Sequence, residues 1–275
     1  SHDNLNIELV MGTGNNMLAD GGYGTPFKAG HMTTKTYTDS WVQMLINSFQ
    51  NADNVIKHVK LILLGNEIDM NGPSLSDAHF KDYYSSWIPD SFNNLKASMQ
   101  EAGLGNIPIS TTIANYPLSN PTAEGTMVQY TSVKHIKDNW SSVWNSNKSL
   151  VLFNQYTPNS GKDVDFGPVI NYFENVDKTL NGTPSVYVGE TGFSAEYQES
   201  NEAIVINQVF SWLEAQYTNQ KLTVPLFIFD AFDRPDKPAG QKKMGIFSDN
   251  SATNNPGTVK PGINIPSWTI KPKGK

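Results

Sequence analysis

The sequence contains no cysteine and few charged residues. The absence of cysteine excludes disulfide bonds, thiolate metal sites and cysteine nucleophiles. Charged residues make up 17% of the 275 residues, against ~25% in an average soluble protein. Asp and Glu (26) outnumber Lys and Arg (20), which gives a net charge of −6. Because nucleic-acid binding relies on an excess of positive charge, we expect no nucleic-acid partner.

Long apolar segments and metal-binding patterns are also lacking. No apolar run approaches the ~20 residues of a membrane-spanning helix, so we expect no membrane span. The five histidines are not grouped at ligand spacing, and without cysteine we expect no metal site. The glycine-rich segments Gly12–Gly14 and Gly21–Gly24 do not match a nucleotide-binding loop that opens a helix. We therefore expect neither a metal ion nor a cofactor.

Short apolar runs alternate with longer amphipathic segments along the chain. Most of these runs are apolar throughout, as in strands that are buried on both faces. Helices are predicted over Asp39–Gln50, Asp90–Ala102, Pro168–Leu180 and Asn201–Gln216. The alternation predicts an α/β fold, and the chain length suits a (β/α)8 TIM barrel. The predicted strands are Ile7–Val10, Val59–Leu64, Pro108–Ile113, Leu150–Phe153, Ser185–Val188 and Leu226–Phe229.

The end of the chain differs in composition from the rest. Periodicity is lost after Asp249, and prolines recur from there to the last residue. Residues 1–250 are therefore predicted to form a single catalytic barrel domain, followed by a Pro-rich C-terminal extension over residues 251–275. We expect this extension to lie over the barrel as an extended segment or to be a disordered end.

Polar residues follow closely on most of the predicted strands. In a (β/α)8 barrel the active site is built at the carboxyl ends of the strands. The polar residues that follow the strands therefore indicate a hydrogen-bonding active site. They do not include the Lys/Arg cluster that a phosphate would need. The residues are Asn15, Asn16, Asn66, Glu67, Asn115, Tyr116, Asn154, Gln155, Tyr156, Glu190 and Asp230.

Glu67 and Glu190 are the two candidate catalytic carboxylates. Carboxyl groups ~5–5.5 Å apart fit retaining glycoside hydrolysis, whereas a separation of ~6.5–9.5 Å fits inversion. One carboxyl group must be protonated to donate to the leaving oxygen, and the other must be ionised to attack the anomeric carbon. Different surroundings and mutual repulsion separate their two pKa values. The alternative is that each is an ordinary strand–loop residue, held in an ion pair.

Four motifs, in order along the chain, resemble those of glycoside hydrolase family 17, the β-1,3-glucanases of clan A. Leu64–Glu67 resembles the family's "(V/L)GNE" element, and Gly189–Phe193 resembles its "ETGWP" element. Phe227–Lys237 is similar to "F-x-F-E-A-F-D-E-P-W-K", and Lys243–Phe247 is similar to "HFGLF". The resemblance spans most of the chain, and it implies a (β/α)8 barrel that acts on β-1,3-glucan.

The resemblance also implies roles for individual residues. Glu67 would be the general acid/base, Glu190 the nucleophile, and Asn66 the ligand of the sugar 2-hydroxyl group. A hydroxyl group at Tyr156 would hold Glu190 ionised, and Phe232 would either stack on a sugar or pack in the protein. The chain departs from the family at Asp230, Arg234 and Asp236, which replace Glu, Glu and Trp. The expected substrate-binding residues are Asn66, Asn115, Tyr156, Phe193, Asp230, Phe232, Asp233 and Lys237.

The expected activity is retaining hydrolysis of β-1,3-glucan or transglycosylation onto an acceptor sugar, and these two outcomes stay open. The alternatives are a non-catalytic glycan-binding barrel and a clan A glycosidase of another linkage specificity. The expected partner is a β-glucan polysaccharide or oligosaccharide. The location implied is secreted, periplasmic or associated with the cell wall.

The motif register further implies that only strands three to eight of the barrel are visible in the sequence. Ile7–Val10 resembles the third strand, since polar residues follow it as they do in the family. Glu67 would then follow strand four and Glu190 strand seven. Because a barrel that lacks strands one and two has two exposed edges, we expect that this chain is a fragment whose barrel is incomplete at the N-terminus, or that another segment or a partner chain completes the barrel.

Overall fold

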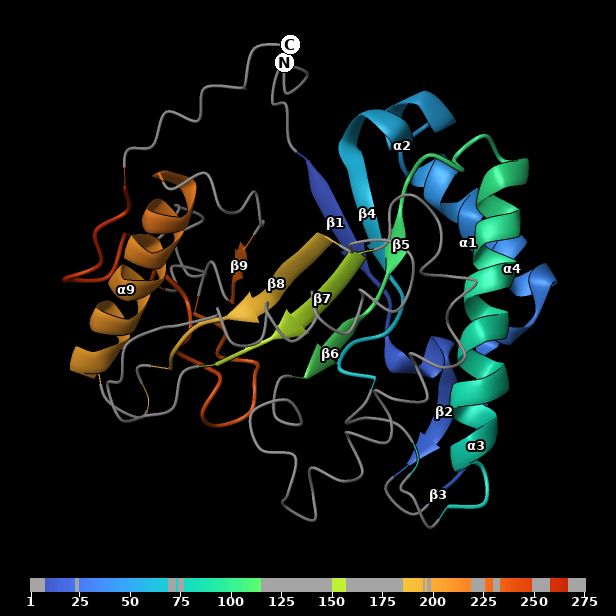
Figure 1. Ribbon diagram of the computed structural model, residues 1–275, viewed down its shortest axis with the longest axis horizontal. Coiled ribbons are helices and arrows are strands. Elements are labelled where there is room, and N and C mark those ends of the chain that lie inside the picture. The colour runs from blue at the N-terminus through green and yellow to red at the C-terminus, as the bar shows by residue number, and fades with distance from the viewer. Residues whose placement is uncertain are drawn as a thin grey trace. The chain divides into compact units, whose positions relative to one another are not determined.

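The computed structural model describes residues 8–22, 25–68, 73, 77–114, 150–156, 185–194, 196, 199–218, 226–229, 233–248 and 258–266. The chain forms two compact units (Figure 1). The first unit comprises residues 1–154 and 168–187, and the second comprises residues 155–167 and 188–275. The predicted helix Pro168–Leu180 lies outside the described residues.

A three-stranded parallel sheet organises the start of the first unit. Its strands are β1 (Leu9–Gly12), β4 (Val59–Leu63) and β5 (Ile109–Ser110), in the order β1-β4-β5. The central strand is apolar along most of its length, and Leu61 and Ile62 are buried. A central strand needs this composition because both of its faces are covered.

Four further strands follow in the hydrogen-bonded order β6-β7-β8-β9. They are β6 (Thr112–Ala114), β7 (Leu150–Asn154), β8 (Ser185–Thr191) and β9 (Leu226–Ile228). β6 pairs with β7 in parallel, and β8 pairs with β9 in parallel. The single strand predicted over Pro108–Ile113 is divided at Thr111, because β5 pairs with β4 whereas β6 pairs with β7. All six predicted strands are present in the described part of the chain, the third of them in two pieces.

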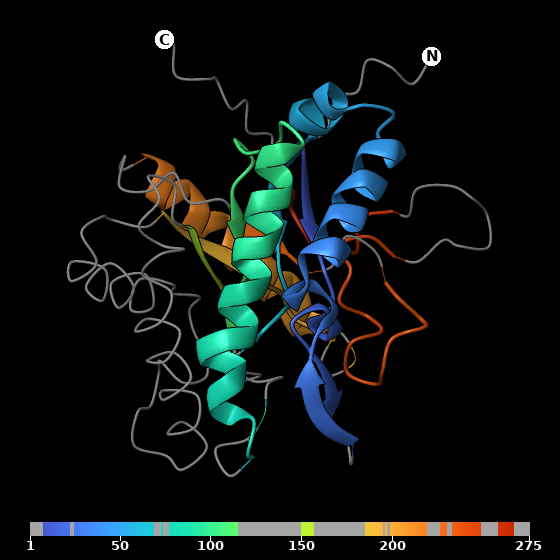
Figure 2. The ribbon, with the colours of Figure 1, turned by 90° about the vertical axis from the view of Figure 1, so that its right-hand side faces the viewer.

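Two long helices flank the β1-β4-β5 sheet on one side (Figure 2). They are α1 (Lys35–Ser48) and α4 (Ile88–Glu101), which pack along one another. Short helical segments precede them: η2 (His31–Thr33) leads into α1, and α3 (Phe80–Asp82) and the π-helix η3 (Tyr83–Trp87) lead into α4. The helix α2 (Ala52–His58) leads into β4, and its N-cap Asn51 accepts a hydrogen bond from the Asn54 backbone N–H (2.8 Å).

The buried face of α1 differs from the apolar stripe that helical spacing predicts for Asp39–Gln50, which consists of Trp41, Leu45, Ile46 and Phe49. The residues that are buried are Thr38, Val42 and Leu45. Thr38 belongs there because its hydroxyl group shares a hydrogen bond of 2.8 Å with that of Ser98 on α4. A polar pair between two helices is invisible to a pattern built from apolar residues alone.

An antiparallel hairpin, which the sequence did not predict, follows the short helix η1 (Asn15–Met17). Its strands are β2 (Ala19–Gly22) and β3 (Thr25–Ala29). Lys28 and Asp20 face one another across the two strands and form an exposed ion pair of 3.0 Å. The short strands carry little apolar alternation, so their sequence resembles that of a glycine-rich loop.

The second unit contains α9 (Glu199–Thr218) and two segments that pair with each other, residues 233–248 and 258–266. Phe247 and Val259 form an antiparallel bridge. Lys260 N donates to Ile246 O (3.0 Å), and Ile263 is buried. Part of the predicted extension is thus hydrogen-bonded into this unit, while the domain boundary at residue 250 stays a prediction. Within the described ranges, every helix is too short or too polar to cross a membrane.

Candidate active site

Glu67 lies in the tight loop that follows β4. Gly65 has a φ of 76° and Glu67 a φ of 47°, so both residues are in the left-handed region. Glycine adopts this region freely, but a side chain there costs about 1–2 kcal/mol. Residues held in this way persist only when their surroundings fix them, and they are frequent at active sites.

Side chains that follow β1 hold the first part of this loop. Thr13 Oγ1 accepts a hydrogen bond from Gly65 N (3.0 Å). Asn15 Oδ1 accepts from Asn66 N (2.6 Å), and Asn15 Nδ2 donates to Asn66 O (2.8 Å). The Asn15 amide group therefore satisfies both backbone polar groups of Asn66, as a neighbouring strand would.

The far end of the loop is held by the π-helix η3. Ile68 is buried, and its carbonyl oxygen accepts hydrogen bonds from Tyr83 Oη and Tyr84 Oη (both 3.3 Å). Ile68 N donates to Thr112 O (3.3 Å). A π-turn changes which side chains face inward, and such turns are frequent at functional sites. Here it allows two consecutive tyrosines to reach one acceptor.

Asn154, the last residue of β7, contacts the side chain of Glu67. Asn154 is buried, and its Nδ2 donates to Glu67 Oε1 (3.2 Å) and to Asn66 Oδ1 (3.3 Å). Thr112 Oγ1 donates to the same Asn66 Oδ1 (2.6 Å). Glu67 itself is partly exposed. The first unit thus presents a carboxyl group that accepts a hydrogen bond from a buried, neutral donor, Asn154.

A prediction about Gly65 tests how tightly this loop is held. Gly65→Ala is expected to lower the free energy of unfolding by about 3 kcal/mol. An added Cβ would lie 2.6 Å from Leu18 Cδ1 and 2.8 Å from Ile68 Cγ2, in addition to the unfavourable φ. Gly103→Ala is the matched control, because Gly103 has a φ of 78° but open space around it. That variant should cost about 1 kcal/mol. Equal losses in urea denaturation would contradict the tight packing of the loop.

Glu190 lies at the end of β8 in the second unit and is bound by a tyrosine. Tyr156 Oη donates to Glu190 Oε2 (2.6 Å), and Gln155 N donates to Glu190 O (2.9 Å). So short an O–H···O contact is typical of a carboxylate acceptor. The Tyr156 ring meets the Phe229 ring edge-on, with 6.5 Å between ring centroids. The structure therefore brings together Tyr156 and Glu190, two of the residues singled out by the sequence.

Gly192 fixes the end of β8 against β9. A Cβ at Gly192 would lie 2.2 Å from Phe229 O, so only glycine fits there. Phe193, the next residue, is 3% exposed. This burial favours packing inside the protein over contact with a sugar ring. Contact of Phe193 with substrate stays a prediction.

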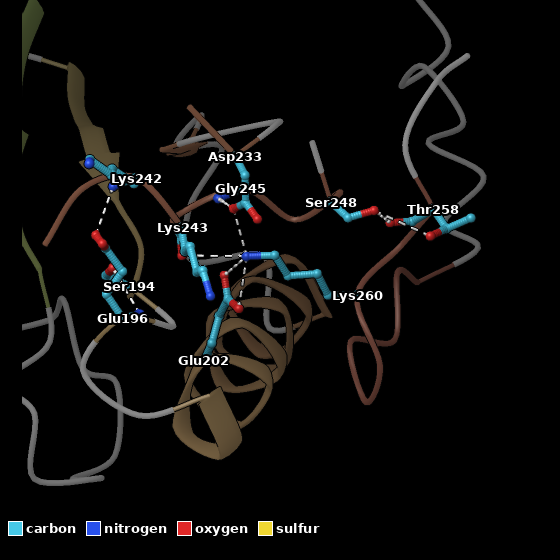
Figure 3. Close-up of polar contacts among 10 residues, drawn as sticks. All are labelled: Ser194, Glu196, Glu202, Asp233, Lys242, Lys243, Gly245, Ser248, Thr258 and Lys260. Atoms are coloured by element: carbon cyan, nitrogen blue, oxygen red, sulfur yellow. Dashed lines mark hydrogen bonds and ion pairs between the residues drawn. The ribbon is translucent and has the colours of Figure 1, made fainter. Parts of the chain in front are cut away.

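Asp233 and Lys237 follow β9 and have partners within the second unit. Asp233 Oδ1 accepts from Gly245 N (3.0 Å) and forms an ion pair of 2.7 Å with Lys260 Nζ (Figure 3). Lys237 Nζ lies 5.5 Å from the centroid of the Phe229 ring, at the distance of a cation–π contact. Their predicted contacts with substrate stay predictions.

Two of the three residues that depart from the family motif, Arg234 and Asp236, pair with one another. Arg234 Nε and Nη2 donate to the two carboxylate oxygens of Asp236 (2.9 and 2.7 Å). The guanidinium group holds the pKa of Asp236 below its usual range. Both side chains are exposed. The loop thus carries a charge pair of its own where the family has Glu and Trp.

Lys260 connects three segments of the second unit (Figure 3). Besides its ion pair with Asp233, its Nζ lies 2.9 and 3.1 Å from the two carboxylate oxygens of Glu202 on α9. The side chains are 13% exposed for Lys260, 3% for Glu202 and 15% for Asp233. Removing one partner of such a buried cluster leaves uncompensated charge.

Lys260→Met is therefore expected to lower the free energy of unfolding by about 3 kcal/mol, as for other broken buried ion pairs. Lys28→Met is the control, since Lys28 pairs with Asp20 on the surface, where its side chain is 71% exposed. The control should change stability by less than about 0.5 kcal/mol. Chemical denaturation of both variants measures the difference. If both variants lose the same small amount of unfolding free energy, Lys260 does not stabilise the packing of residues 258–266 in the second unit.

Three of the predicted substrate-binding residues, Asn115, Asp230 and Phe232, lie outside the described residues. Sequence reasoning passed over Thr13, Thr112 and Lys260. The only signal for the two threonines was their position directly after or at the start of a strand, and Lys260 gave none because it lies in a Pro-rich segment. In the described part of the chain, no group of three acidic or histidine side chains is placed to hold a metal ion.

Comparison with solved structures identifies similar proteins. One is a plant β-glucan endohydrolase, 14% identical, with a TM-score of 0.57; the match covers 88% of this chain and 81% of that one. Another is an endo-laminarinase from Formosa Hel1_33_131, 16% identical, with a TM-score of 0.51 and coverage of 84% and 64%. A glycoside hydrolase family 17 β-1,3-glucanosyltransferase from Rhizomucor miehei is 17% identical, with a TM-score of 0.47 and coverage of 83% and 71%.

Searches with the sequence itself find no matching family model and no matching curated protein. The likeness to solved structures is therefore one of fold. Together with the parallel strands and their flanking helices, it confirms the predicted α/β fold of the (β/α)8-barrel type.

Proposed function

We propose that this protein is a retaining glycoside hydrolase that acts on β-1,3-glucan, with Glu190 as nucleophile and Glu67 as general acid/base. One observation carries the proposal. Each of the two carboxyl groups lies at the carboxyl end of a parallel strand and is bound by an uncharged donor, Asn154 for Glu67 and Tyr156 for Glu190.

The first half of the reaction forms a glycosyl-enzyme ester. A Glu190 oxygen attacks the anomeric carbon while the glycosidic C–O bond breaks. Glu67 transfers its proton to the departing oxygen, which leaves as the hydroxyl group of the released sugar. The Tyr156 hydroxyl group donates to Glu190 and so favours the ionised form that can attack.

The second half releases the sugar. Glu67, now ionised, takes a proton from water, and the oxygen of that water attacks the anomeric carbon and displaces Glu190. The hydroxyl group of an acceptor sugar can take the place of water, which gives a transglycosylation product. Asn154 Nδ2 donates to Glu67 Oε1 and so positions the carboxyl group for this step.

The choice of a neutral polysaccharide rests on chemistry and on the neighbours. The chain has 29 asparagines and only 17% charged residues, a composition suited to hydrogen-bonding hydroxyl groups rather than binding ions. Two of the proteins with a similar structure are a β-glucan endohydrolase and an endo-laminarinase. We further propose that Asn66, Asn115, Asp230, Phe232, Asp233 and Lys237 contact the glucan, and that the protein acts outside the cytoplasm or at the cell wall.

Release of reducing ends from laminarin tests the proposal. We expect release from laminarin, less from a mixed-linkage β-glucan, and none from cellulose. Oligosaccharides longer than the starting substrate would indicate transglycosylation. Binding of laminarin without release of reducing ends would instead identify a glycan-binding barrel, and cleavage of another polymer alone would identify a different linkage specificity.

A further inference from the structure

Thr112 lies where one strand passes from the first sheet to the second. Its predecessor Ser110 belongs to β5, which pairs with β4, whereas Thr112 begins β6 and pairs with Leu152 of β7. The change of partner at Thr111 allows the start of β6 to contact the loop that follows β4. Thr112 is 2% exposed, so its hydroxyl group must find partners within the protein.

The Thr112 hydroxyl group bridges both residues of the Asn66-Glu67 pair. It accepts from Glu67 N (2.8 Å) and donates to Asn66 Oδ1 (2.6 Å). Because a hydroxyl group has a single proton, the bond from Glu67 N–H leaves that proton for Asn66. Asn154 Nδ2 donates to the same Asn66 oxygen. Two donors on one side fix which end of the Asn66 amide group is oxygen, and so which way its NH₂ group points.

The same contact restrains the backbone of Glu67. The left-handed φ of 47° is unfavourable for a glutamate and requires support from its neighbours. The bond from Glu67 N–H to Thr112 supplies such support next to the Glu67 side chain, while Asn154 positions Oε1.

We propose that Thr112 is a positioning residue for the reaction: it orients the Asn66 amide group toward the sugar and holds Glu67 in its working conformation. The inference rests on the proposed function, in which Asn66 binds the 2-hydroxyl group and Glu67 is the acid/base. Its effect is indirect, through two residues that touch substrate. Thr112 therefore affects the transition state, where these contacts strengthen, more than it affects substrate binding.

Thr112→Val removes the hydroxyl group and keeps the shape of the side chain, while Thr112→Ser keeps the hydroxyl group. We expect kcat/KM on laminari-oligosaccharides to fall about 10–100-fold for Thr112→Val, mostly in kcat, as misplaced catalytic groups do. Thr112→Ser should restore activity to within about threefold of the wild type. Thr111→Val is the control, because Thr111 Oγ1 is also buried but has no hydrogen-bond partner among the described residues. Its kcat/KM should not change.

A double-variant cycle tests whether Thr112 acts through Asn66. In the Asn66→Ala background, Thr112→Val should cost less than it does alone, because one of the groups it positions is gone. If Thr112→Val lowers kcat/KM by the same factor with and without the Asn66 side chain, the inference is overturned.

Hydrogen exchange of the Glu67 amide N–H, measured by NMR without substrate, provides a readout independent of turnover. Exchange should be about tenfold faster or more in Thr112→Val, and unchanged in Thr112→Ser and Thr111→Val, since a lost hydrogen bond weakens protection. Unchanged exchange in Thr112→Val would show that Thr112 does not hold the Glu67 backbone N–H group.

Unchanged kcat/KM in a soluble Thr112→Val would overturn the positioning role and leave the proposed function intact. A wild-type protein that cleaves no glycoside would overturn both. If Thr112→Val does not fold, Thr112→Ala takes its place in all three measurements.

Discussion

Glu190→Ala is expected to lower kcat on laminarin by more than about 10⁴-fold, because the covalent route is lost with the nucleophile. Initial rates of reducing-end release measure the loss. Substrate binding should persist, because Asn66 and Glu67 are unchanged. Glu214→Ala, which removes an exposed glutamate of α9, is the matched control and should retain wild-type activity.

Rescue of Glu190→Ala by added azide distinguishes the loss of the nucleophile from misfolding of the variant. In Glu190→Ala a small anion can occupy the space of the missing carboxylate and attack the anomeric carbon directly. A single displacement then gives a glycosyl azide of inverted configuration, α from a β-glucan. Full activity of Glu190→Ala without azide would refute the assignment, and a β-glycosyl azide would indicate that Glu190 is the acid/base.

Glu67→Ala is expected to depend strongly on the leaving group. On laminarin, kcat/KM should fall about 10²–10⁴-fold, because the departing sugar oxygen needs a proton. On a dinitrophenyl β-glycoside, kcat/KM should change less than about tenfold, since this leaving group departs as a stable anion without general acid help. Steady-state kinetics on the two substrates check the contrast.

The control for this variant is Glu101→Ala, which removes a glutamate of α4 that pairs with Lys35 on the surface. It should leave both substrates unaffected, because exposed ion pairs contribute little. Equal losses on laminarin and on the activated glycoside would contradict the acid role of Glu67. Such a result would point instead to binding or folding.

The parallel strands could be predicted because a strand that is buried on both faces must be apolar throughout, and such apolar runs are visible in the sequence. The helix α9 was predictable in the same way, since Val205, Ile206 and Val209 recur at helical spacing and are buried. Features that depend on hydrogen bonds between polar groups could not be predicted. The Thr38–Ser98 contact and the break at Thr111 depend on hydrogen bonds between distant residues, which periodicity does not record. The β2–β3 hairpin is local, but its short strands carry too little apolar alternation to be predicted.

The candidate site shows the same division. Glu67 and Glu190 could be located from the sequence because each follows a buried strand within a recognisable motif. The contacts that hold the Glu67 loop could not be predicted, because the two residues of each hydrogen bond are 45 to 87 positions apart in the sequence. Asn15 and Asn154 were predicted as members of a polar site at the strand ends, but not as the residues that hold the Glu67 loop. Their roles depend on which strands are neighbours and on the left-handed φ of Glu67, a conformation that tertiary contacts impose.

The stereochemical course of hydrolysis tests the central claim most directly. Proton NMR of laminari-oligosaccharide cleavage, followed in real time, distinguishes the two anomers of the new reducing end before mutarotation mixes them. A double displacement through Glu190 with acid/base help from Glu67 predicts that the β-anomer appears first. First appearance of the α-anomer would contradict the retaining mechanism, and no cleavage of any β-glucan would contradict the enzymatic function itself.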